Sequence, residues 1–410
     1  MKLKQERSMT VSTTFSKEYK IFIFGLFISR IGDSLYTFAL PWIAYQLTDS
    51  AVIMSSLFAI NVLPIVLFGP IVGVIVDRYD QRRLLWIADA ISIILVSLVP
   101  ILHSLHLLEI WHLYVITFIL AVMSMLFDVT TVTVIPHIAG ASLTKANSLY
   151  QMVNQLSSLL GPMLAGLCIS FIGGFQVLWI NVLSFIATLV AVMLLPSIIT
   201  LNSKNNDKNT LQNVLADLLD GFKWLKNDRL NIALSFQAIV GNFGASAVLG
   251  VLMYYLLSTL HLTPEQSGFN YTLIGIGGLL GSLIAVPLEK RLRRGVLIPL
   301  LLFLGALGLT IALWSTYWIA PGIAFGIGIA MTCNIAWNTI IASVRQETVP
   351  SNMQGRVLGF SRVLTRLAMP LGALVGGIIS AYNPVFVFAL AAFTKLLEVF
   401  IALCSPIRKL

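Results

Sequence analysis

Twelve long apolar runs divide this chain, and short polar segments separate them. A run of about 20 mostly apolar residues is long enough to cross a bilayer as a helix. Sheets with open edges leave backbone groups unsatisfied in lipid, and the runs lack the alternation of barrel strands. We therefore predict membrane helices at residues 20–47, 51–76, 84–105, 112–136, 146–171, 176–198, 229–259, 267–288, 296–314, 318–344, 356–381 and 384–405.

The composition excludes a soluble protein. Hydrophobic residues make up 58% of the 410 residues and charged residues only 10%, whereas about 25% of the residues of a soluble domain are charged. The expected partner is therefore a lipid bilayer. A net charge of +9 would indicate nucleic acid in a soluble protein. Here the basic residues lie in short loops, so we expect no nucleic-acid binding.

The placement of the basic residues predicts the topology. If the N-terminus is cytoplasmic, 22 of the 26 lysines and arginines fall in cytoplasmic segments and none in the six outer loops. Cytoplasmic loops are generally enriched in these residues. We expect a multi-pass protein of the cytoplasmic (inner) cell membrane with both termini in the cytoplasm. The remaining four basic residues lie inside helices: Arg30, Arg362, Arg366 and Lys395.

A polar stretch divides the chain into two six-helix bundles. Residues 199–228 contain LQNVLADLLDGFKWLKND, whose apolar residues form one helical stripe. We predict a cytoplasmic linker with an amphipathic helix between a bundle at 1–198, which includes a cytoplasmic tail at 1–19, and a bundle at 229–410. LTKANSLYQMVNQLSSLLGPMLAG and NMQGRVLGFSRVLTRLAMPLGALVGG resemble each other, so the bundles are pseudo-symmetric. Such repeats are typical of transporters whose halves rock about a central site.

The most specific local motif follows the second run. It reads GVIVDRYDQRR, from Gly73 to Arg83. With the twelve helices, the repeat and the central linker, it resembles the signature of the major facilitator superfamily along nearly the whole chain. The resemblance implies a conformational latch at Gly73, Asp77, Arg78, Arg82 and Arg83. Gly73 would let two helices approach closely, and Asp77 would face the positive N-terminus of the eleventh helix. The alternative is a basic loop that only sets the topology.

Other motifs narrow the resemblance. Gly161 and Pro162 open a GPxxAG segment that is similar to the antiporter motif of drug exporters, with alanine where a glycine is usual. The missing N–H of Pro162 permits a helix bend there. Ile31–Ser34, Ala39–Trp42 and Gly355–Val357 resemble the macrolide-efflux and enterobactin-exporter branch. This branch implies export of amphiphilic molecules, usually by proton antiport, with no cofactor besides the proton gradient.

Charged residues at membrane depth are costly and are therefore functional candidates. Asp33 lies about 20 Å from the inner end of its helix, and Asp128 about 13 Å from the inner end of the fourth. Removal from water favours a protonated carboxyl, whereas a nearby cation such as Arg30 favours the ionised form. Asp33, Arg30 and Asp128 are therefore candidates for proton coupling. The alternatives are a static lock at Asp33 and a helix–helix hydrogen bond at Asp128.

Arg362 and Arg366 lie on one face of the eleventh helix, four residues apart. Two interpretations remain open for this pair. Either the arginines bind Asp33 or Asp128 when the halves close, or they bind an anionic substrate. Lys395 and Glu398 are spaced i, i+3 and are expected to pair on an outer helix.

Uncharged polar residues in the runs are candidates for an amphipathic substrate cavity. Any single one of them more often forms a hydrogen bond between helices than a contact with a substrate. The candidates are Tyr36, Gln151, Asn154, Gln155, Gln237, Asn242, Asn334, Trp337 and Asn338.

No phosphate-binding loop, HExxH or nucleophile-elbow motif is present. We therefore expect a transporter and not an enzyme, with no metal site, acting as a monomer. The favoured hypothesis is a secondary transporter that exports small amphiphilic compounds by proton antiport. The alternatives are a uniporter or importer of a nutrient or anion on the same fold, and a membrane-embedded enzyme or lipid scramblase.

Overall fold

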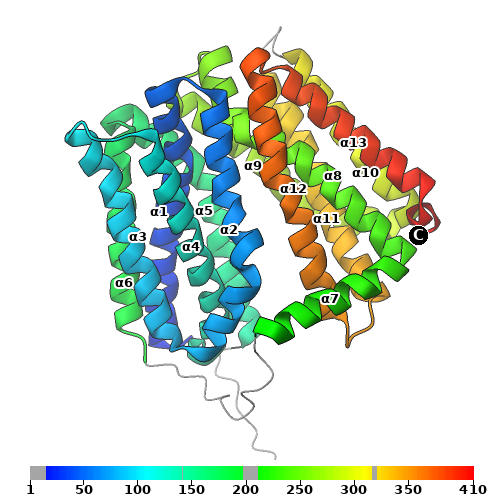
Figure 1. Cartoon of the computed structure of the whole chain (residues 1–410), viewed down its shortest axis with the longest axis horizontal. Helices are drawn as coiled ribbons and strands as arrows, with labels where there is room; N and C mark the ends of the chain where they lie inside the picture. Colours follow the sequence, from blue (N-terminus) through cyan, green and yellow to red (C-terminus); the bar gives the residue numbers. More distant parts are fainter. Residues whose placement is uncertain (1–14, 141, 197–210, 316–320) are drawn as a thin grey trace, which may run out of the picture.

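The computed structural model describes residues 15–140, 142–196, 211–315 and 321–410. Twelve helices in these ranges are long and apolar enough to cross a membrane, and they run side by side through the molecule (Figure 1). The predicted all-α membrane fold is confirmed. The basic residues before residue 15 and the start of the predicted linker, residues 199–210, lie outside the described ranges.

The first six helices form one bundle. In this N-terminal half, α1 packs on α5 and α6, α3 packs on α4 and α6, and α2 packs on α4. The helices are α1 (Lys17–Thr48), α2 (Ala51–Arg78), α3 (Gln81–Ser104), α4 (Ile110–Ile138), α5 (Leu143–Ile172) and α6 (Gly174–Met193).

The last six membrane helices form the C-terminal half and repeat this pattern. Here α8 packs on α12 and α13, α10 packs on α11 and α13, and α9 packs on α11. Each pairing has its counterpart in the first half, so the halves share one topology. The helices are α8 (Arg229–Tyr254) with the π-helical turn η2 (Tyr255–Thr259), α9 (Pro264–Arg291), α10 (Arg294–Ser315), α11 (Pro321–Thr348), α12 (Gln354–Tyr382) and α13 (Phe386–Cys404), followed by the short η3 (Pro406–Lys409).

Side-chain caps define where several helices begin. The Asp80 carboxylate accepts the backbone N–H of Arg82 at 2.9 Å and that of Arg83 at 3.3 Å, at the start of α3. Thr263 and Gln266 form a reciprocal capping box at the start of α9. These caps satisfy N–H groups that have no partner within the helix. They allow the tight turns that keep neighbouring helices antiparallel.

Helix α7 (Leu211–Asn227) lies where the amphipathic linker helix is predicted, and it packs mainly on α12. Leu225 is buried against Val349 and Val357. The Nε of Arg356 lies 2.7 Å from an oxygen of Asp217, and its Nη1 lies 3.4 Å from Asp220. The helix is therefore attached to the C-terminal half. We call the end of the molecule that carries α7 the linker side and the opposite end the far side.

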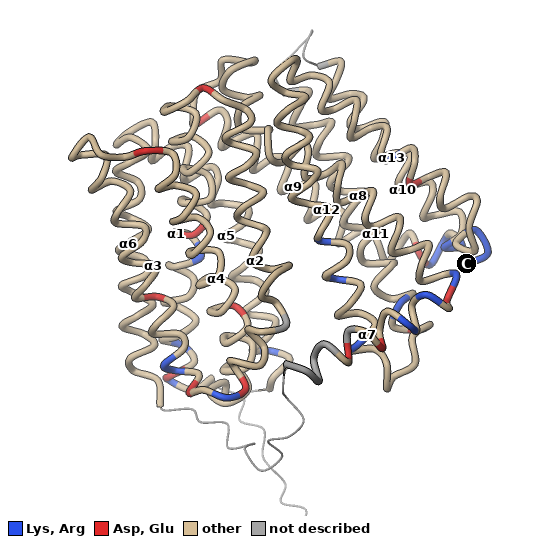
Figure 2. The backbone as a smooth tube through the Cα atoms, in the orientation of Figure 1, with Lys and Arg blue, Asp and Glu red and all other residues tan. Residues whose placement is uncertain are grey.

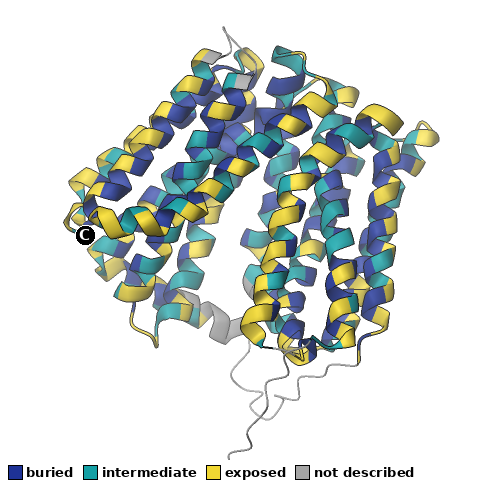
Figure 3. Cartoon of the chain, turned by 180° about the vertical axis from the view of Figure 1, so that it is seen from behind, coloured by how far each residue is buried: buried dark blue, intermediate teal, exposed yellow. Residues whose placement is uncertain are grey.

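The charges and the exposed apolar residues are distributed as a bilayer requires. Lysines and arginines gather around the helix ends on the linker side (Figure 2). Exposed residues follow the outer faces of the helices (Figure 3), and they include large apolar side chains such as Leu183, Leu283 and Phe393. Apolar side chains on an outer surface contact lipid when a helix crosses a bilayer.

Within the described ranges, the close contacts between the two halves lie toward the far side. A Cβ built on Gly377 of α12 would lie 1.8 Å from the Oγ of Ser55 on α2, and one on Gly268 of α9 would lie 2.3 Å from the carbonyl oxygen of Pro162 on α5. Toward the linker side, a Cβ on Gly73 of α2 or Gly359 of α12 would meet nothing within 4 Å. The space between the halves is therefore open to the linker side.

The predicted latch residues lie at this open end. Gly73 is predicted to let two helices approach closely, yet open space surrounds it here because the halves are apart at this end. Asp77, Arg78 and Arg83 are exposed at this end. Arg82 donates from Nη2 to the carbonyl oxygen of Met193, which ties the start of α3 to the end of α6. A latch role in the closed state stays a prediction.

Candidate functional site

Arg30 of α1 joins two carboxylates at depth in the N-terminal half. Its Nη2 donates to Oδ1 of Asp128 on α4, and its Nη1 lies 3.4 Å from Oδ2 of Asp33 on α1. The Arg30 side chain is only 14% exposed, whereas that of Asp128 is 47% exposed. Its guanidinium also lies 5.9 Å from the centre of the Phe127 ring. A charge that is removed from water needs such partners to remain ionised.

Asp89 of α3 is a fourth member of this cluster, and the sequence prediction missed it. Its side chain is buried, and Oδ2 has no hydrogen-bond partner among the described residues. Asp89, Asp33 and Arg30 line one small cavity of about 70 Å³. A signal for it was available, because Asp89 is the only acid in the apolar run at 84–105.

Three carboxyl groups and one guanidinium therefore lie together, and the guanidinium pairs with two of the three. We call Arg30, Asp33, Asp89 and Asp128 the acidic cluster. Its four members come from α1, α3 and α4. If all the carboxyls were ionised, the cluster would carry two negative charges in excess, which is costly at low dielectric. Binding of a proton lowers this cost, so the cluster has the chemistry of a proton-exchange site.

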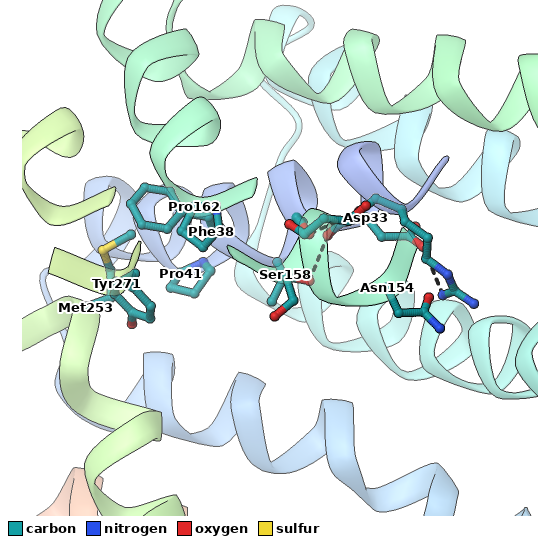
Figure 4. A pocket seen from close by; sticks show the side chains of 12 residues that line it. Asp33, Phe38, Pro41, Asn154, Ser158, Pro162, Met253 and Tyr271 are labelled. Carbon is teal, nitrogen blue, oxygen red and sulfur yellow. Dashed lines mark hydrogen bonds and ion pairs between the residues drawn. The ribbon is translucent and has the colours of Figure 1, made fainter. Parts of the chain in front are cut away.

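A central cavity of about 350 Å³ extends from the cluster to the C-terminal half. Asp33, Ser158 and Asn154 lie toward one end, and Phe38, Pro41, Met253 and Tyr271 toward the other (Figure 4). One end is polar and charged, and the other is aromatic and apolar. Cavities of this size and character hold small amphiphilic molecules.

A larger cavity of about 600 Å³ lies between the halves and is lined by α2, α4 and α12. We call it the vestibule. Asp128 and Asn61 line it from the N-terminal half, and Arg362 and Arg366 from the C-terminal half. The vestibule therefore brings together Asp128 and the two arginines. The interpretation in which the arginines bind Asp128 when the halves close requires this arrangement. Neither arginine forms an ion pair with any residue in the described ranges.

Several predicted cavity residues are instead bonded within the C-terminal half. Gln237 and Trp337 are buried, and the Nε1 of Trp337 donates to Oε1 of Gln237 at 3.1 Å. Asn242 donates to the carbonyl oxygen of Thr365 at 3.0 Å. Asn334 accepts from the Nζ of Lys395 at 3.2 Å. These side chains form hydrogen bonds between helices of the C-terminal half. None of them lines the cavities described above.

The other predicted cavity residues have mixed positions. Tyr36 lines the small cavity beside Asp89, and its hydroxyl lies 3.4 Å from that of Thr117. Gln151, Gln155 and Asn338 are exposed but do not line the three cavities. Their place in a substrate cavity stays a prediction.

Gly161 and Pro162 lie where α5 meets the cavity. A Cβ on Gly161 would lie 2.1 Å from the Cβ of Ser34, so this glycine allows α5 to pack directly against α1. Pro162 lines the central cavity. Helix α5 is assigned as continuous from Leu143 to Ile172. The helix bend implied by the antiporter motif stays a prediction.

Two charged residues of α13 form a buried pair. The Nζ of Lys395 lies 2.9 Å from Oε1 of Glu398, and both side chains are buried. The pair was expected on an outer helix, but it faces inward, because Lys395 also reaches Asn334 and Trp337 of α11. In the described ranges, no group of three or more His, Cys, Asp or Glu side chains is arranged to hold a metal ion.

Comparisons with known proteins agree with this geometry. The chain is 26% identical to the multidrug efflux pump Tap of Mycolicibacterium fortuitum, over 87% of this chain and 88% of that protein. It is 22% identical to macrolide efflux protein A of Streptococcus pyogenes, over 86% and 87%. A bacterial homologue of the iron transporter ferroportin, in the inward-facing state, has a TM-score of 0.75 at 16% identity and covers 94% of this chain and 97% of its own.

The family itself follows from a match along most of the sequence. Residues 22–373 match the Major Facilitator Superfamily. This range runs from α1 into α12 and includes most of both halves, the linker and the acidic cluster. The chain is therefore a multi-pass membrane transporter that belongs to the major facilitator superfamily.

Proposed function

We propose that this transporter exports small amphiphilic compounds across the cell membrane in exchange for protons. The efflux pumps named above support export, because they align with nearly the whole chain. The central cavity supports an amphiphilic substrate, since it offers carboxylate and amide groups at one end and Phe38 and Tyr271 at the other. The protein would work as a monomer, with the proton gradient as its only energy source and no bound cofactor.

The proposed orientation places the linker side in the cytoplasm. The clustering of lysines and arginines at that end supports it. The conformation described here would then be open to the cytoplasm and ready to accept a compound for export. Both termini would be cytoplasmic. The closed far side, where Gly377 meets Ser55, would open in the other half of the cycle.

The observation that carries proton coupling is the contact of one guanidinium with Asp33 and Asp128 beside a substrate-sized cavity. A cationic or polar substrate near Asp33 would favour the ionised carboxyl and release a proton. A proton that binds there in the outward-open state would displace the substrate. Competition of the substrate and the proton for one site is the simplest way to exchange them across the membrane.

Proteoliposomes with an acid interior test this proposal. The probe is the amphiphilic cation rhodamine B ethyl ester, and equal potassium with valinomycin on both sides holds the voltage at zero. The dye should accumulate in the vesicles, and dissipation of the pH gradient with nigericin should release it. Asp33→Asn should lose at least tenfold in accumulation, whereas Asp49→Asn, in the far-side turn, should not. A dye that equilibrates independently of the gradient would indicate uniport and overturn the coupling.

A further inference from the structure

The two walls of the vestibule carry opposite charge. On the N-terminal side, Asp128 lines the vestibule, and it belongs to the acidic cluster, in which three carboxyls outnumber one guanidinium. On the C-terminal side, Arg362 and Arg366 line the vestibule, and α11 contributes a third arginine, Arg345. The sequence had placed Arg345 in a loop. It instead lies in the last turn of α11, half-buried, and donates to the hydroxyl of Ser235 at 3.3 Å.

No acid of the C-terminal half is available to these three arginines in the described ranges. Glu289 and Glu347 pair with Arg294, and Glu398 pairs with Lys395. Asp217 and Asp220 pair with Arg356, Asp228 caps α8, and Glu265 lies at the far-side start of α9. The positive wall is therefore uncompensated from within its own half.

Asp128 across the vestibule could balance only part of this charge. Its carboxylate already accepts from Arg30. It would have to share or abandon that contact to pair with Arg362 or Arg366, and Arg345 would stay uncompensated. The guanidiniums of Arg362 and Arg366, one helical turn apart in a cavity at membrane depth, are costly without an anion. A ligand that supplies the anion removes this cost.

The spacing of the two lining arginines suits a planar anion. Residues four apart on a helix have Cβ atoms about 5–6 Å apart on one face. Guanidinium groups at that separation can each donate two parallel N–H bonds to a carboxylate or phosphate. Both side chains are exposed into a cavity of about 600 Å³, which can hold such a group together with an apolar body.

We propose that Arg362 and Arg366 form a subsite for an anionic group of the exported compound. The substrate class is then amphiphiles that carry a carboxylate or a similar anion, including zwitterions whose cationic end lies toward the acidic cluster. This inference deepens the proposed function and rests on it. A gate, in which the arginines bind only Asp128 when the linker side closes, is the competing role.

A matched pair of dyes separates the two roles. Rhodamine B carries a free carboxylate at pH 7.5, and rhodamine B ethyl ester differs from it only in the esterified carboxyl. Dissociation constants for both dyes are measured by fluorescence polarisation on the purified full-length protein in lipid nanodiscs. The measured quantity is the ratio of the two affinities. Arg293→Gln, an exposed arginine of the turn between α9 and α10, serves as the control.

The subsite predicts that the wild type binds rhodamine B more tightly than its ester. Arg362→Gln and Arg366→Gln should each lower this preference about tenfold, and Arg366→Lys should keep part of it because the charge remains without the planar fork. Arg293→Gln should keep the wild-type ratio. An unchanged ratio in both glutamine variants would overturn the subsite. An equal loss of affinity for both dyes would also overturn it and indicate the gate.

This result is independent of the test of proton coupling. The ester alone reports on proton-driven export, because it lacks the anion that the arginines would bind. If the ester is exported while the ratio is unaffected by the variants, the subsite fails and the proposed function stands. If the ratio shifts but the pH gradient drives no transport, the subsite stands and the coupling fails.

Discussion

Arg30 of α1 donates to the carboxylate of Asp128 on α4 and also reaches Asp33 one turn further along its own helix. One guanidinium thus links two helices of the N-terminal half, between the central cavity, which Arg30 lines, and the vestibule, which Asp128 lines. Asp89 lies behind it with one oxygen unpaired among the described residues. The charge state of this cluster can therefore affect both substrate binding and the packing of α1 on α4.

Removal of Arg30 should make stability strongly dependent on pH. In Arg30→Gln the cluster loses the guanidinium that pairs with Asp33 and Asp128, so the ionised forms of its carboxyls become more costly. Protonation removes that cost, and the variant should gain stability as the pH falls. We expect its melting temperature to be higher at pH 5 than at pH 8, by a larger margin than in the wild type. A parallel pH profile in both proteins would contradict the assigned role.

The buried pair of α13 offers a test within the C-terminal half. Lys395→Met would leave Glu398 buried without its partner at 2.9 Å. Loss of one member of a buried pair costs about 3–5 kcal/mol, whereas replacement of both by apolar residues is often neutral. We expect a large fall in melting temperature for Lys395→Met and recovery of most of it in the Lys395→Met, Glu398→Met double variant. A double variant as unstable as the single one would exclude a local ion-pair effect.

Substitutions at two glycines of α12, Gly377 and Gly359, should differ in their effect on the conformational equilibrium. Gly377→Val places atoms where Ser55 already lies, so it should disfavour the state with the far side closed. Gly359→Val has open space in this state and should not disfavour it. Fluorescent maleimide labelling of a cysteine at Val363, in the vestibule, should slow in Gly377→Val. It should remain at or above the wild-type rate in Gly359→Val.

The labelling result has a clear contrary outcome. If Gly377→Val leaves the labelling rate at Val363 unchanged, contact between α2 and α12 does not determine which side is open. A protein that no longer elutes as a single species would indicate misfolding, so elution is checked for each variant first.

The attachment of α7 to α12 should depend on Arg356. Its contacts with Asp217 and Asp220 are partly exposed, and exposed pairs contribute about 0–1 kcal/mol each. Arg356→Gln should therefore raise hydrogen exchange in α7 severalfold with little change in overall melting temperature. Charge reversal at both positions, Arg356→Asp with Asp217→Arg, should restore part of the protection. Unchanged exchange in Arg356→Gln would mean that Leu225 and its apolar neighbours hold the helix alone.

The membrane helices were predictable because a spanning helix must be long and apolar throughout, which leaves a clear pattern in the sequence. The contact of Arg30 with Asp33 was also predictable, since their separation of three residues places them on one helical face. The contact of Arg30 with Asp128 was not predictable. The two residues are 98 positions apart in the sequence, and their contact depends on how α1 packs against α4.

The predicted cavity was least accurate where helices are apolar on all sides. Gln237 and Trp337 bond to each other inside the C-terminal half, and nothing in their spacing shows this, since they lie on different helices. Asp89, by contrast, stands out as a lone acid in an apolar run, and burial cost alone is enough to mark it.

Proton movement driven by a substrate gradient tests proton exchange at the acidic cluster most directly. Proteoliposomes hold the pH indicator pyranine, valinomycin clamps the voltage, and rhodamine B ethyl ester is added outside. The account predicts that entry of the dye makes the interior more alkaline in the wild type and in Asp49→Asn, and that the alkalinisation is absent in Asp33→Asn. Dye entry into wild-type vesicles without any change in internal pH would contradict it.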